Sequence, residues 1–504
     1  MRHAACALVA ALAGTAHAQL LDVLNHTPPR VYEGQSVVRV RADSIREVNA
    51  AMALSESLWS EGAGVNAPFD LQIRVDRIGA LREAGLEVEI MIPDLQANAD
   101  RAWAELRQAA RFDRPRPLNT PRGGNPHDEA WFANYKQLDQ IYAYINNIAA
   151  ARPELASVSD VGNTIQGRDL FAITITGPDQ PGNAAADRPV VLWNGCQHAR
   201  EWVSPMTVTY LASRLVSDYD TDPVVKDLVD SIRFVIVPVT NPDGYLYSWS
   251  TERYWRKNRR STYGVDLNRN WGYEWGGDGS SGATDSDIYR GAAPFSEPET
   301  QSLRDLALSF GDDLVAHIDY HTYSQLILYP FGYADGVQAP EPDRTFFQNL
   351  TEDMSDLIQS QSGAFYNPIV SWLLYPAAGT ASDWFYGDPG AKSLTIELRP
   401  SDQDVFGLDG FSPPASTILP TAQENWAAAK LFAQRTTLPL AFGLDAPTTV
   451  AANEQPVIGF TLTPGTQDYD PTSVVVSARI GAGPFIPVPT TPNGTGTYSA
   501  TLPA

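Results

Sequence analysis

The feature that most restricts the fold of this chain is an alternation of short apolar runs with helix-length segments between residues 130 and 435. The apolar runs lie at 190–193, 234–239, 314–318 and 394–396, and the helical patterns near 131–150, 205–218, 297–309 and 343–361. Strands buried on both faces lose their polar alternation, and such strands are typical of parallel sheets covered by helices. The pattern predicts an α/β domain over 125–437, with a mixed, mostly parallel central sheet and helices on both faces.

Residues 30 to 100 show a smaller alternation. Strand-like runs at 36–40, 70–75 and 86–92 are interspersed with helical stretches near 44–56, 78–84 and 96–110. We therefore expect a small α/β open-sandwich domain over 19–110, with one open-faced sheet. Residues 111–124 combine proline, glycine and arginine, which predicts an extended linker open to proteases. A trypsin-like enzyme could cut this linker at Arg114, Arg116 or Arg122.

The composition changes again after the helical stretch near 421–435. Residues 438–504 are rich in Thr, Pro, Val and Gly and contain strand-like runs at 456–462 and 473–477. They predict the beginning of a β-sandwich, with a turn at Asn493-Gly494. Because about 65 residues is short for such a module, this domain could be incomplete.

The first 18 residues have the pattern of an export signal. Arg2 and His3 precede a small apolar run at 4–16, and Ala16-His17-Ala18 is an A-x-A cleavage site. The run is too short to span a bilayer, and no later segment approaches ~20 uninterrupted apolar residues, so we expect no membrane span. The mature protein is expected to begin near Gln19 and to be secreted, into the extracellular space or the periplasm.

Charge and cysteine content exclude some functions. A formal net charge of −23 disfavours binding to nucleic-acid phosphates. Cys6 lies in the expected leader, so the mature chain has Cys196 alone and no internal disulfide. Cys196 lies two residues before His198, so a thiolate metal ligand has to be considered. A small buried residue is the favoured interpretation, because single cysteines mostly belong to the core.

Polar clusters occur at or beside the ends of the predicted strands, at 198–201, at 254–257 with 266–271, at 321 and at 397. In open α/β sheets, ligands bind beyond the carboxyl ends of strands, so four such clusters indicate a site. His198 and Glu201 are three residues apart and can converge on one cation. A catalytic zinc ion needs a third protein ligand and keeps one position for water. His321 is the best candidate, and His317, inside the same apolar run, is expected to pack in the sheet.

Together these residues resemble the zinc carboxypeptidases of the pancreatic carboxypeptidase A and B type, from roughly residue 130 to 430. The motifs are His-Ala-Arg-Glu-Trp at 198–202, Trp-Arg-Lys at 255–257, Gly-Val-Asp-Leu-Asn-Arg-Asn-Trp at 264–271, Tyr-Arg-Gly at 289–291, His-Thr-Tyr-Ser-Gln-Leu-Ile-Leu-Tyr-Pro at 321–330, Asp-Trp at 383–384 and Thr-Ile-Glu-Leu-Arg at 395–399. Each motif alone is weak, but the set in this order is highly specific. Residues 30 to 100 resemble the activation segment of the same family, especially at 32–35 and 92–96.

The resemblance implies one Zn²⁺ per chain, held by His198, Glu201 and His321. It implies that Glu397 is the general base that deprotonates the zinc-bound water and later protonates the leaving amine. Arg256 would stabilise the oxyanion that forms at the scissile carbonyl.

For substrate binding, the resemblance implies that Asn268, Arg269 and Tyr375 grip the free C-terminal carboxylate of a peptide, a task that suits the planar fork of arginine. Arg200 would touch the next residue inward. Asp266 would orient a ligand imidazole.

Specificity depends on the residue before Asp383, which in this family lies at the base of the pocket for the C-terminal side chain. An acid there selects basic ends and an aliphatic residue selects apolar ones, whereas this chain has Ser382. Val370, Ala377 and Thr395 make the expected walls small and uncharged. We therefore expect a preference for apolar or aromatic C-terminal residues, which could be broad.

The sequence thus predicts a secreted zinc metallocarboxypeptidase made as a precursor, whose partners are peptide or protein substrates and an activating protease. Two alternatives stay open. One is a zinc hydrolase of another amide bond, such as a cell-wall peptide or an acyl-amino acid. The other is a binding module that keeps the fold and the carboxylate grip without turnover.

Overall fold

The computed structural model describes residues 27, 29–60, 63–66, 68–112, 126–401, 409–411, 413–437, 440–445, 455–464, 474–478, 486–494 and 496–502. The chain divides into two compact units, Met1–Ala429 and Lys430–Ala504. The predicted export signal and the predicted linker beyond residue 112, with its three candidate cleavage sites, lie outside the described residues.

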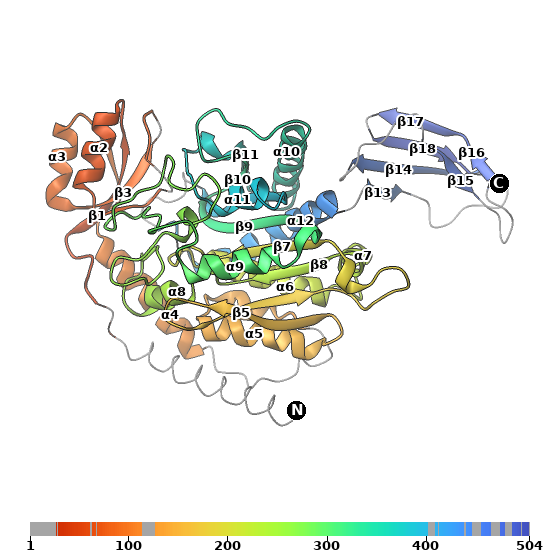
Figure 1. The fold of residues 1–504 in the computed structure, drawn as a ribbon, viewed down its shortest axis with the longest axis horizontal. Helices are drawn as coiled ribbons and strands as arrows, with labels where there is room; N and C mark the ends of the chain where they lie inside the picture. Colours follow the sequence, from red (N-terminus) through yellow and green to blue (C-terminus); the bar gives the residue numbers. More distant parts are fainter. Residues whose placement is uncertain are drawn as a thin grey trace, which may run out of the picture. The chain divides into compact units, whose positions relative to one another are not determined.

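An eight-stranded mixed sheet forms the centre of the first unit, in the order β11-β10-β12-β9-β7-β8-β6-β5 (Figure 1). Its strands are β5 Ala156–Asn163, β6 Asp169–Ile175, β7 Val190–Gly195, β8 Arg233–Val237, β9 Leu314–Ser324, β10 Leu326–Tyr329, β11 Asn367–Val370 and β12 Lys392–Ser401. The middle strands β12, β9, β7 and β8 are parallel to one another, whereas β10 pairs antiparallel with β12, and β6 antiparallel with β8 and β5. This confirms the prediction of a mixed, mostly parallel sheet.

Helices cover both faces of this sheet. They are α5 Leu138–Ala151, α6 Val203–Ser217, α7 Pro223–Ser231, α8 Pro242–Ser250, α9 Pro298–Leu308, α10 Asp343–Ser362, α11 Ala381–Gly387 and α12 Ile418–Thr437. Val190 and Leu192 of β7 share a core with Leu303 of α9 and Trp384 of α11. Alternate side chains of a strand point to opposite faces, and α6, which contacts α5, packs against β7 and β9 on the other face. All six residues of β7 are therefore buried, which explains its continuous apolar run.

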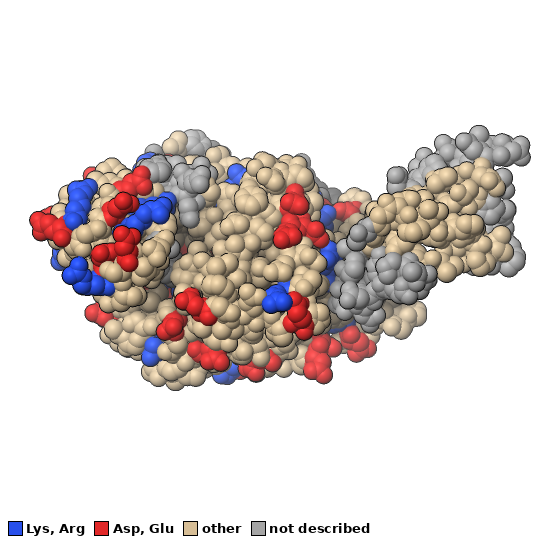
Figure 2. Space-filling view, turned by 90° about the horizontal axis from the view of Figure 1, so that it is seen from above, with Lys and Arg blue, Asp and Glu red and all other residues tan. Residues whose placement is uncertain are grey.

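The N-terminal domain (residues 29–112) is a small α/β sandwich. Its antiparallel sheet has the order β2-β3-β1-β4. The elements are β1 Gln35–Arg41, α2 Ile45–Leu54, β2 Ser57–Leu58, β3 Phe69–Arg74, α3 Ile78–Glu83, β4 Glu87–Ile92 and α4 Leu95–Phe112. Val38 and Leu71 pack with α2 and α3 in one core. Basic and acidic side chains are interspersed on this domain, at the left of Figure 2.

The helix-free face of this small sheet packs against the rest of the first unit. Asp70 and Gln72 of β3 point to that face and are buried. The Tyr323 hydroxyl of the central domain (residues 126–429) donates to Asp70 at 2.9 Å. The predicted open sandwich is therefore present, and its helix-free face forms an interface with the central domain.

The second unit is rich in β-structure. Its strands are β13 Leu440–Asp445, β14 Val457–Pro464, β15 Val476–Ala478, β16 Ile486–Val488, β17 Thr490–Gly494 and β18 Thr497–Thr501. They form a four-stranded sheet, β13-β14-β18-β17, and the pair β15-β16. Phe460 and Tyr498 of the larger sheet share a core with Val488 of the smaller pair, which agrees with the predicted sandwich. Among the described residues, no helix has both the length and the apolar character needed to cross a membrane.

Candidate metal centre and substrate cleft

The carboxyl ends of three neighbouring strands bring the predicted metal site together. His198 and Glu201 lie in the loop after β7, which turns sharply at Cys196 with a φ of 57°. His321 lies on β9, and Glu397 on β12 is directly opposite it in the strand register. All four polar side chains are buried. The parallel order β12-β9-β7 is therefore what gathers residues that are up to 199 positions apart in the sequence, from 198 to 397.

Three donor groups converge at one point. His198 Nδ1 lies 2.7 Å from Glu201 Oε1, His321 Nδ1 lies 3.0 Å from Glu201 Oε2, and the two Nδ1 atoms are 3.0 Å apart. Among the described residues, these three side chains form the one group whose ligand atoms all lie within 4.8 Å of one another. Two imidazole nitrogens and one carboxylate are the ligand types of a catalytic zinc site with a free position.

The electrostatics of this group favour a bound cation. Burial opposes the charged form of His321, but the Asp319 and Glu201 carboxylates raise its pKa well above the usual range. Burial likewise raises the pKa of Glu201, yet His198 and His321 bring it below its ordinary value. The site thus stabilises positive charge between the three donors, and the residues fit a divalent metal ion.

A carboxylate holds the far nitrogen of each imidazole. Asp266 Oδ1 lies 3.1 Å from His198 Nε2, and Asp319 Oδ2 lies 2.7 Å from His321 Nε2. Each carboxylate accepts a hydrogen bond from Nε2–H, which orients Nδ1 of the ring toward the common centre. The sequence analysis predicted the role of Asp266 but missed Asp319. The Asp-x-His spacing of Asp319 and His321 could have indicated this contact, because residues two apart on a strand share one face.

Asp266 also holds the predicted oxyanion residue. Arg256 donates to Asp266 Oδ2 from Nη2 at 3.0 Å and from Nε at 3.2 Å. The Asn268 backbone N–H donates to Asp266 Oδ1 at 2.9 Å. Burial raises the pKa of Asp266, but Arg256 and His198 hold it well below its usual range. The ionised Asp266 carboxylate therefore links His198, the Arg256 guanidinium and the backbone of Asn268.

Two of the predicted carboxylate-binding residues, Asn268 and Arg269, lie on the short helix η4, Leu267–Arg269. The Asn268 Oδ1 atom accepts from the Ala381 backbone N–H at 2.9 Å, so its amide is tied to the start of α11. Arg269 donates from Nε to the Gly279 carbonyl at 2.8 Å and from Nη1 to the Asn268 carbonyl at 2.8 Å. Tyr375 is half-buried in the segment before α11.

The predicted specificity residues come from several elements, with Ser382 on α11, Val370 on β11 and Thr395 on β12. Ser382, Val370, Ala377 and Thr395 are all buried. Both oxygens of Asp383 accept from the Gly332 backbone N–H at 2.9 Å. Burial raises the pKa of Asp383 to about 7, although these backbone donors oppose the shift.

The N-terminal domain lies against the cleft. Arg200 Nη2 donates to the Leu58 carbonyl at 3.1 Å and to the Trp59 carbonyl at 3.4 Å. The Trp59 ring contacts Tyr254, with centroids 4.7 Å apart, and Phe411, with centroids 5.2 Å apart. Arg200 itself lies over the Phe411 ring at 4.0 Å. A predicted substrate-binding arginine is thus occupied by backbone of the N-terminal domain.

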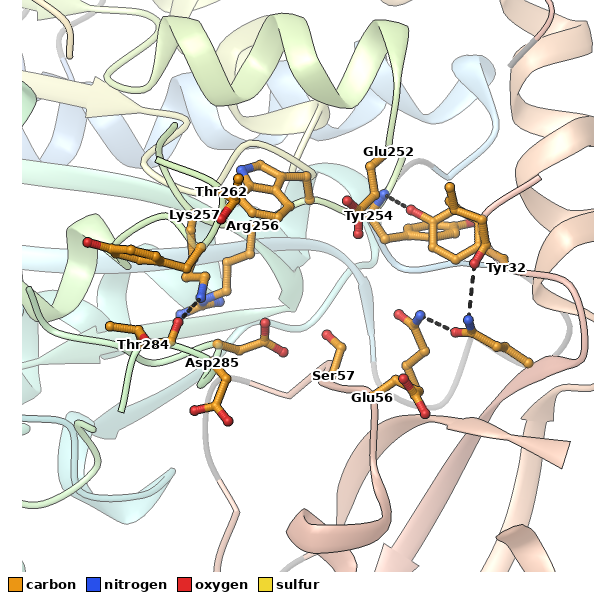
Figure 3. Close-up of a pocket in the computed structure, with 16 residues that line it drawn as sticks. Tyr32, Glu56, Ser57, Glu252, Tyr254, Arg256, Lys257, Thr262, Thr284 and Asp285 are labelled. Carbon is orange, nitrogen blue, oxygen red and sulfur yellow. Dashed lines mark hydrogen bonds between the residues drawn. The ribbon is translucent and has the colours of Figure 1, made fainter. Parts of the chain in front are cut away.

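A polar cavity of about 310 Å³ remains between the two domains. Figure 3 shows Glu56 and Ser57 of the N-terminal domain across this cavity from Arg256, whereas Tyr32 lies against Tyr254 and accepts from its backbone N–H at 2.9 Å. Its lining includes Arg256, so the cavity adjoins the site, and residues of the N-terminal domain form one of its walls.

Two residues that could have been ligands are not part of the donor group. Cys196 is buried with its Sγ 3.7 Å from the His198 carbonyl, and burial raises the pKa of its thiol well above the usual value. His317 is buried in β9 between Ser393 and Asn194, at 2.8 and 2.7 Å. Both agree with the structural role that the sequence analysis favoured.

Comparisons with known proteins agree with this geometry. A family model described as zinc carboxypeptidase matches residues 141–428. Carboxypeptidase A1 of Rattus norvegicus is 33% identical over 414 residues, which cover 79% of this chain and 92% of that protein. Carboxypeptidase B of Astacus astacus is 35% identical over 310 residues, which cover 60% of this chain and 97% of that protein. The solved carboxypeptidase A from Helicoverpa armigera superimposes with a TM-score of 0.69 at 26% identity, covering 81% of this chain and 98% of its own. The chain therefore belongs to the zinc carboxypeptidase family and is a zinc-dependent peptide hydrolase.

Proposed function

We propose that this metallocarboxypeptidase is a secreted enzyme, made as a precursor, that removes single C-terminal residues from peptides or proteins and prefers apolar or aromatic ones. The observation that carries the proposal is the convergence of His198, Glu201 and His321 at a point beside Glu397 on the neighbouring strand. A metal site and an adjacent carboxylate are the minimum that metal-assisted hydrolysis of an amide needs.

In this proposal His198, Glu201 and His321 hold one zinc ion per chain, which supplies a Lewis acid for the scissile carbonyl and an acidified water as nucleophile. Glu397 acts as the general base and then returns the proton to the leaving amine. Arg256 donates to the oxygen on which negative charge develops, and Asp266 keeps its guanidinium in place.

Asn268, Arg269 and Tyr375 bind the substrate's terminal carboxylate. The bond from the Ala381 N–H to Asn268 Oδ1 supports this role, because it fixes the amide with its Nδ2 donor toward the metal site, 3.4 Å from His321 Nε2. Arg269 is buried, and the planar fork of a buried guanidinium is well suited to pair with an anion bidentately. Arg200 binds the residue before the terminal one once the N-terminal domain has left.

The preference for apolar or aromatic ends rests on the pocket residues Ser382, Val370, Ala377 and Thr395, which carry no charge. Asp383 contributes no full negative charge below pH 7, because its pKa is about 7. A C-terminal scan of peptides Xaa-Xaa-Xaa-Z, with all natural residues at Z, tests the preference. Fastest release of Arg or Lys would contradict it.

The precursor proposal rests on the contacts between the N-terminal domain and the cleft. Arg200 is bound by the Leu58 and Trp59 carbonyls, and Tyr323 by Asp70, so both are withheld from a substrate. A protease that cuts between residues 111 and 124 would release the domain. The uncut chain should be much less active than the trypsin-cut chain, whereas equal rates would contradict the capping role. Trp59→Ala should raise the activity of the uncut chain, and Trp131→Ala, which removes a ring stacked on Tyr144 of α5, serves as an aromatic control in the central domain.

Secretion is proposed from the first 18 residues. Expression of the full chain in an exporting host, followed by mass spectrometry of the secreted fraction, should give a mature N-terminus near Gln19. Retention of the intact leader inside the cell would contradict export.

The decisive experiment for the reaction compares peptides with free and amidated C-termini, incubated with the cut protein. Loss of single residues from free ends only would establish exopeptidase activity and the carboxylate grip together. Cleavage of acyl-amino acids or cell-wall peptides in preference to these would favour a different amide bond. Binding without turnover by the zinc-loaded protein would favour a non-catalytic binding module.

A further inference from the structure

A row of buried polar side chains runs along one face of β9 toward the metal site. His317, Asp319 and His321 are two residues apart in turn, so they share that face. Asn194 of β7 bridges the first two, because it lies 2.7 Å from His317 Nε2 and 2.7 Å from Asp319 Oδ1. Ser393 of β12 lies 2.8 Å from His317 Nδ1 and closes the far end of the row. Every member is 0–1% exposed, so water does not substitute for these bonds.

The donor and acceptor of each hydrogen bond in the row can be assigned by starting from the Asp319 carboxylate. The Asp319 carboxylate only accepts, so Asn194 presents Nδ2 to it and turns Oδ1 toward His317. His317 Nε2 must then carry the proton and donate to Asn194. Burial lowers the pKa of His317 to about 3, so the ring is neutral and Nδ1 accepts from the Ser393 hydroxyl. One tautomer and one amide orientation satisfy the whole row.

Packing holds the first residue of the row in place. The His317 ring lies flat on Phe385 of α11, with centroids 3.6 Å apart and planes 7° apart. A phenylalanine could occupy the same space, so packing alone does not require a histidine here. The requirement comes from the two hydrogen bonds of the ring.

We propose that His317 is a positioning residue for the zinc site: by donating to Asn194 it keeps an N–H directed at Asp319, and Asp319 in turn fixes the imidazole of His321. The inference rests on the proposed role of His321 as a zinc ligand. Without the His317 donor, the Asn194 carbonyl is a buried acceptor against an apolar ring, and rotation that relieves it withdraws the N–H from Asp319. The carboxylate and the His321 ring then lose their single orientation.

The test uses the full chain with His317→Phe, which keeps the stack on Phe385 and removes the donor. Zinc affinity is measured by competition with a chromophoric chelator, and the visible spectrum of the Co²⁺-substituted protein reports ligand geometry. Partners that orient metal-bound histidines change metal affinity by about 10–100-fold, and this residue acts one step further out, so we expect a rise in the zinc Kd of about 10-fold. The Co²⁺ bands should shift as well.

Two further variants separate positioning from packing. His317→Gln offers an amide N–H near the position of Nε2 and should restore most of the affinity and the wild-type Co²⁺ spectrum. Phe385→Leu removes the stack but leaves the row intact, so it should lower the unfolding midpoint without changing the zinc Kd. Should His317→Phe fail to fold, Ser393→Ala is the alternative variant, with a smaller change in volume. It removes the hydroxyl that fixes the His317 proton on Nε2, so it should still weaken zinc binding.

The outcomes distinguish the inference from the proposed function. Wild-type zinc affinity and an unchanged Co²⁺ spectrum in His317→Phe, or in Ser393→Ala if the former does not fold, would overturn the inference alone. A wild-type chain that binds no zinc, or that binds it equally well after His321→Ala, would instead overturn the ligand assignment on which the inference rests.

Discussion

Asp266→Asn removes one charge and almost no volume from the centre of the site. The carboxylate accepts from His198 Nε2 at 3.1 Å, from Arg256 Nη2 at 3.0 Å and from the Asn268 N–H at 2.9 Å. An asparagine has one carbonyl oxygen and an NH₂ group, so either His198 or Arg256 must face a second donor. The substitution therefore disturbs the metal ligand or the oxyanion residue, whichever way the amide turns.

The size of each effect can be estimated separately. Loss of the partner of a metal-bound histidine weakens metal binding by about 10–100-fold. Loss of one oxyanion donor lowers kcat by about 10²–10³-fold. Since Asp266 makes two bonds to Arg256, we expect kcat in saturating zinc to fall by about 100-fold, and the zinc Kd to rise by at least ~10-fold.

The assay is hydrolysis of a peptide with a free C-terminus by the cut enzyme, over a zinc titration that separates affinity from kcat. The double variant Asp266→Asn/Arg256→Ala completes the cycle. If Asp266 acts on kcat through Arg256, the double variant should be little slower than Arg256→Ala alone. Fully multiplicative losses, or a single Asp266→Asn variant with wild-type kcat in excess zinc, would refute the reasoning.

Three further predictions concern other parts of the central domain. Glu397→Gln should lower kcat by about 10²–10⁴-fold while one zinc ion per chain stays bound, as metal analysis can check. Arg269→Lys should raise KM by about 10-fold for peptides with free C-termini, because the bidentate fork is lost, and a kcat-only defect would contradict this role. Burial raises the pKa of Glu299 from 4.5 to about 7, so its contribution to stability is complete below pH 4.5 and is lost as the pH rises through 7. Its loss corresponds to about 3 kcal/mol, and Glu299→Gln should therefore flatten the decline of the unfolding midpoint between pH 5 and pH 8, relative to the wild type.

The sequence predicted the strands whose environment leaves a plain pattern. β7, β8, β9 and β12 are buried on both faces, so they appear as apolar runs. The hairpin β5-β6 was missed because β5 is an edge strand with the mostly polar sequence ASVSDVGN. The short strands β10 and β11 have four residues each, too few for periodicity to distinguish them from loops.

The site was predictable where function rests on contiguous motifs and less so where it rests on contacts across the sheet. His198, Glu201 and His321 were found from residue type and position at strand ends. The bridge from Asn194 to Asp319 joins residues 125 positions apart, and it exists because β7 and β9 pair in the register Asn194↔Asp319. A single sequence contains no information on that register. The same holds for the face of the N-terminal domain around Asp70, whose burial depends on an interface between two domains.

Asp266 and Asp319, the carboxylates that bind the two imidazoles, differ in their other hydrogen-bond partners. These partners determine which residues of the site each carboxylate affects. Asp266 binds the Arg256 guanidinium as well as His198, so it links the metal site to the residue proposed to stabilise the oxyanion. Asp319 receives its other bonds from neutral amides, those of Asn194 at 2.7 Å and Gln197 at 2.5 Å. Its charge therefore acts mainly on His321, where it raises the pKa of the imidazole. We therefore expect substitutions of Asp266 to affect both metal binding and the proposed oxyanion residue, and substitutions of Asp319 to affect metal binding alone.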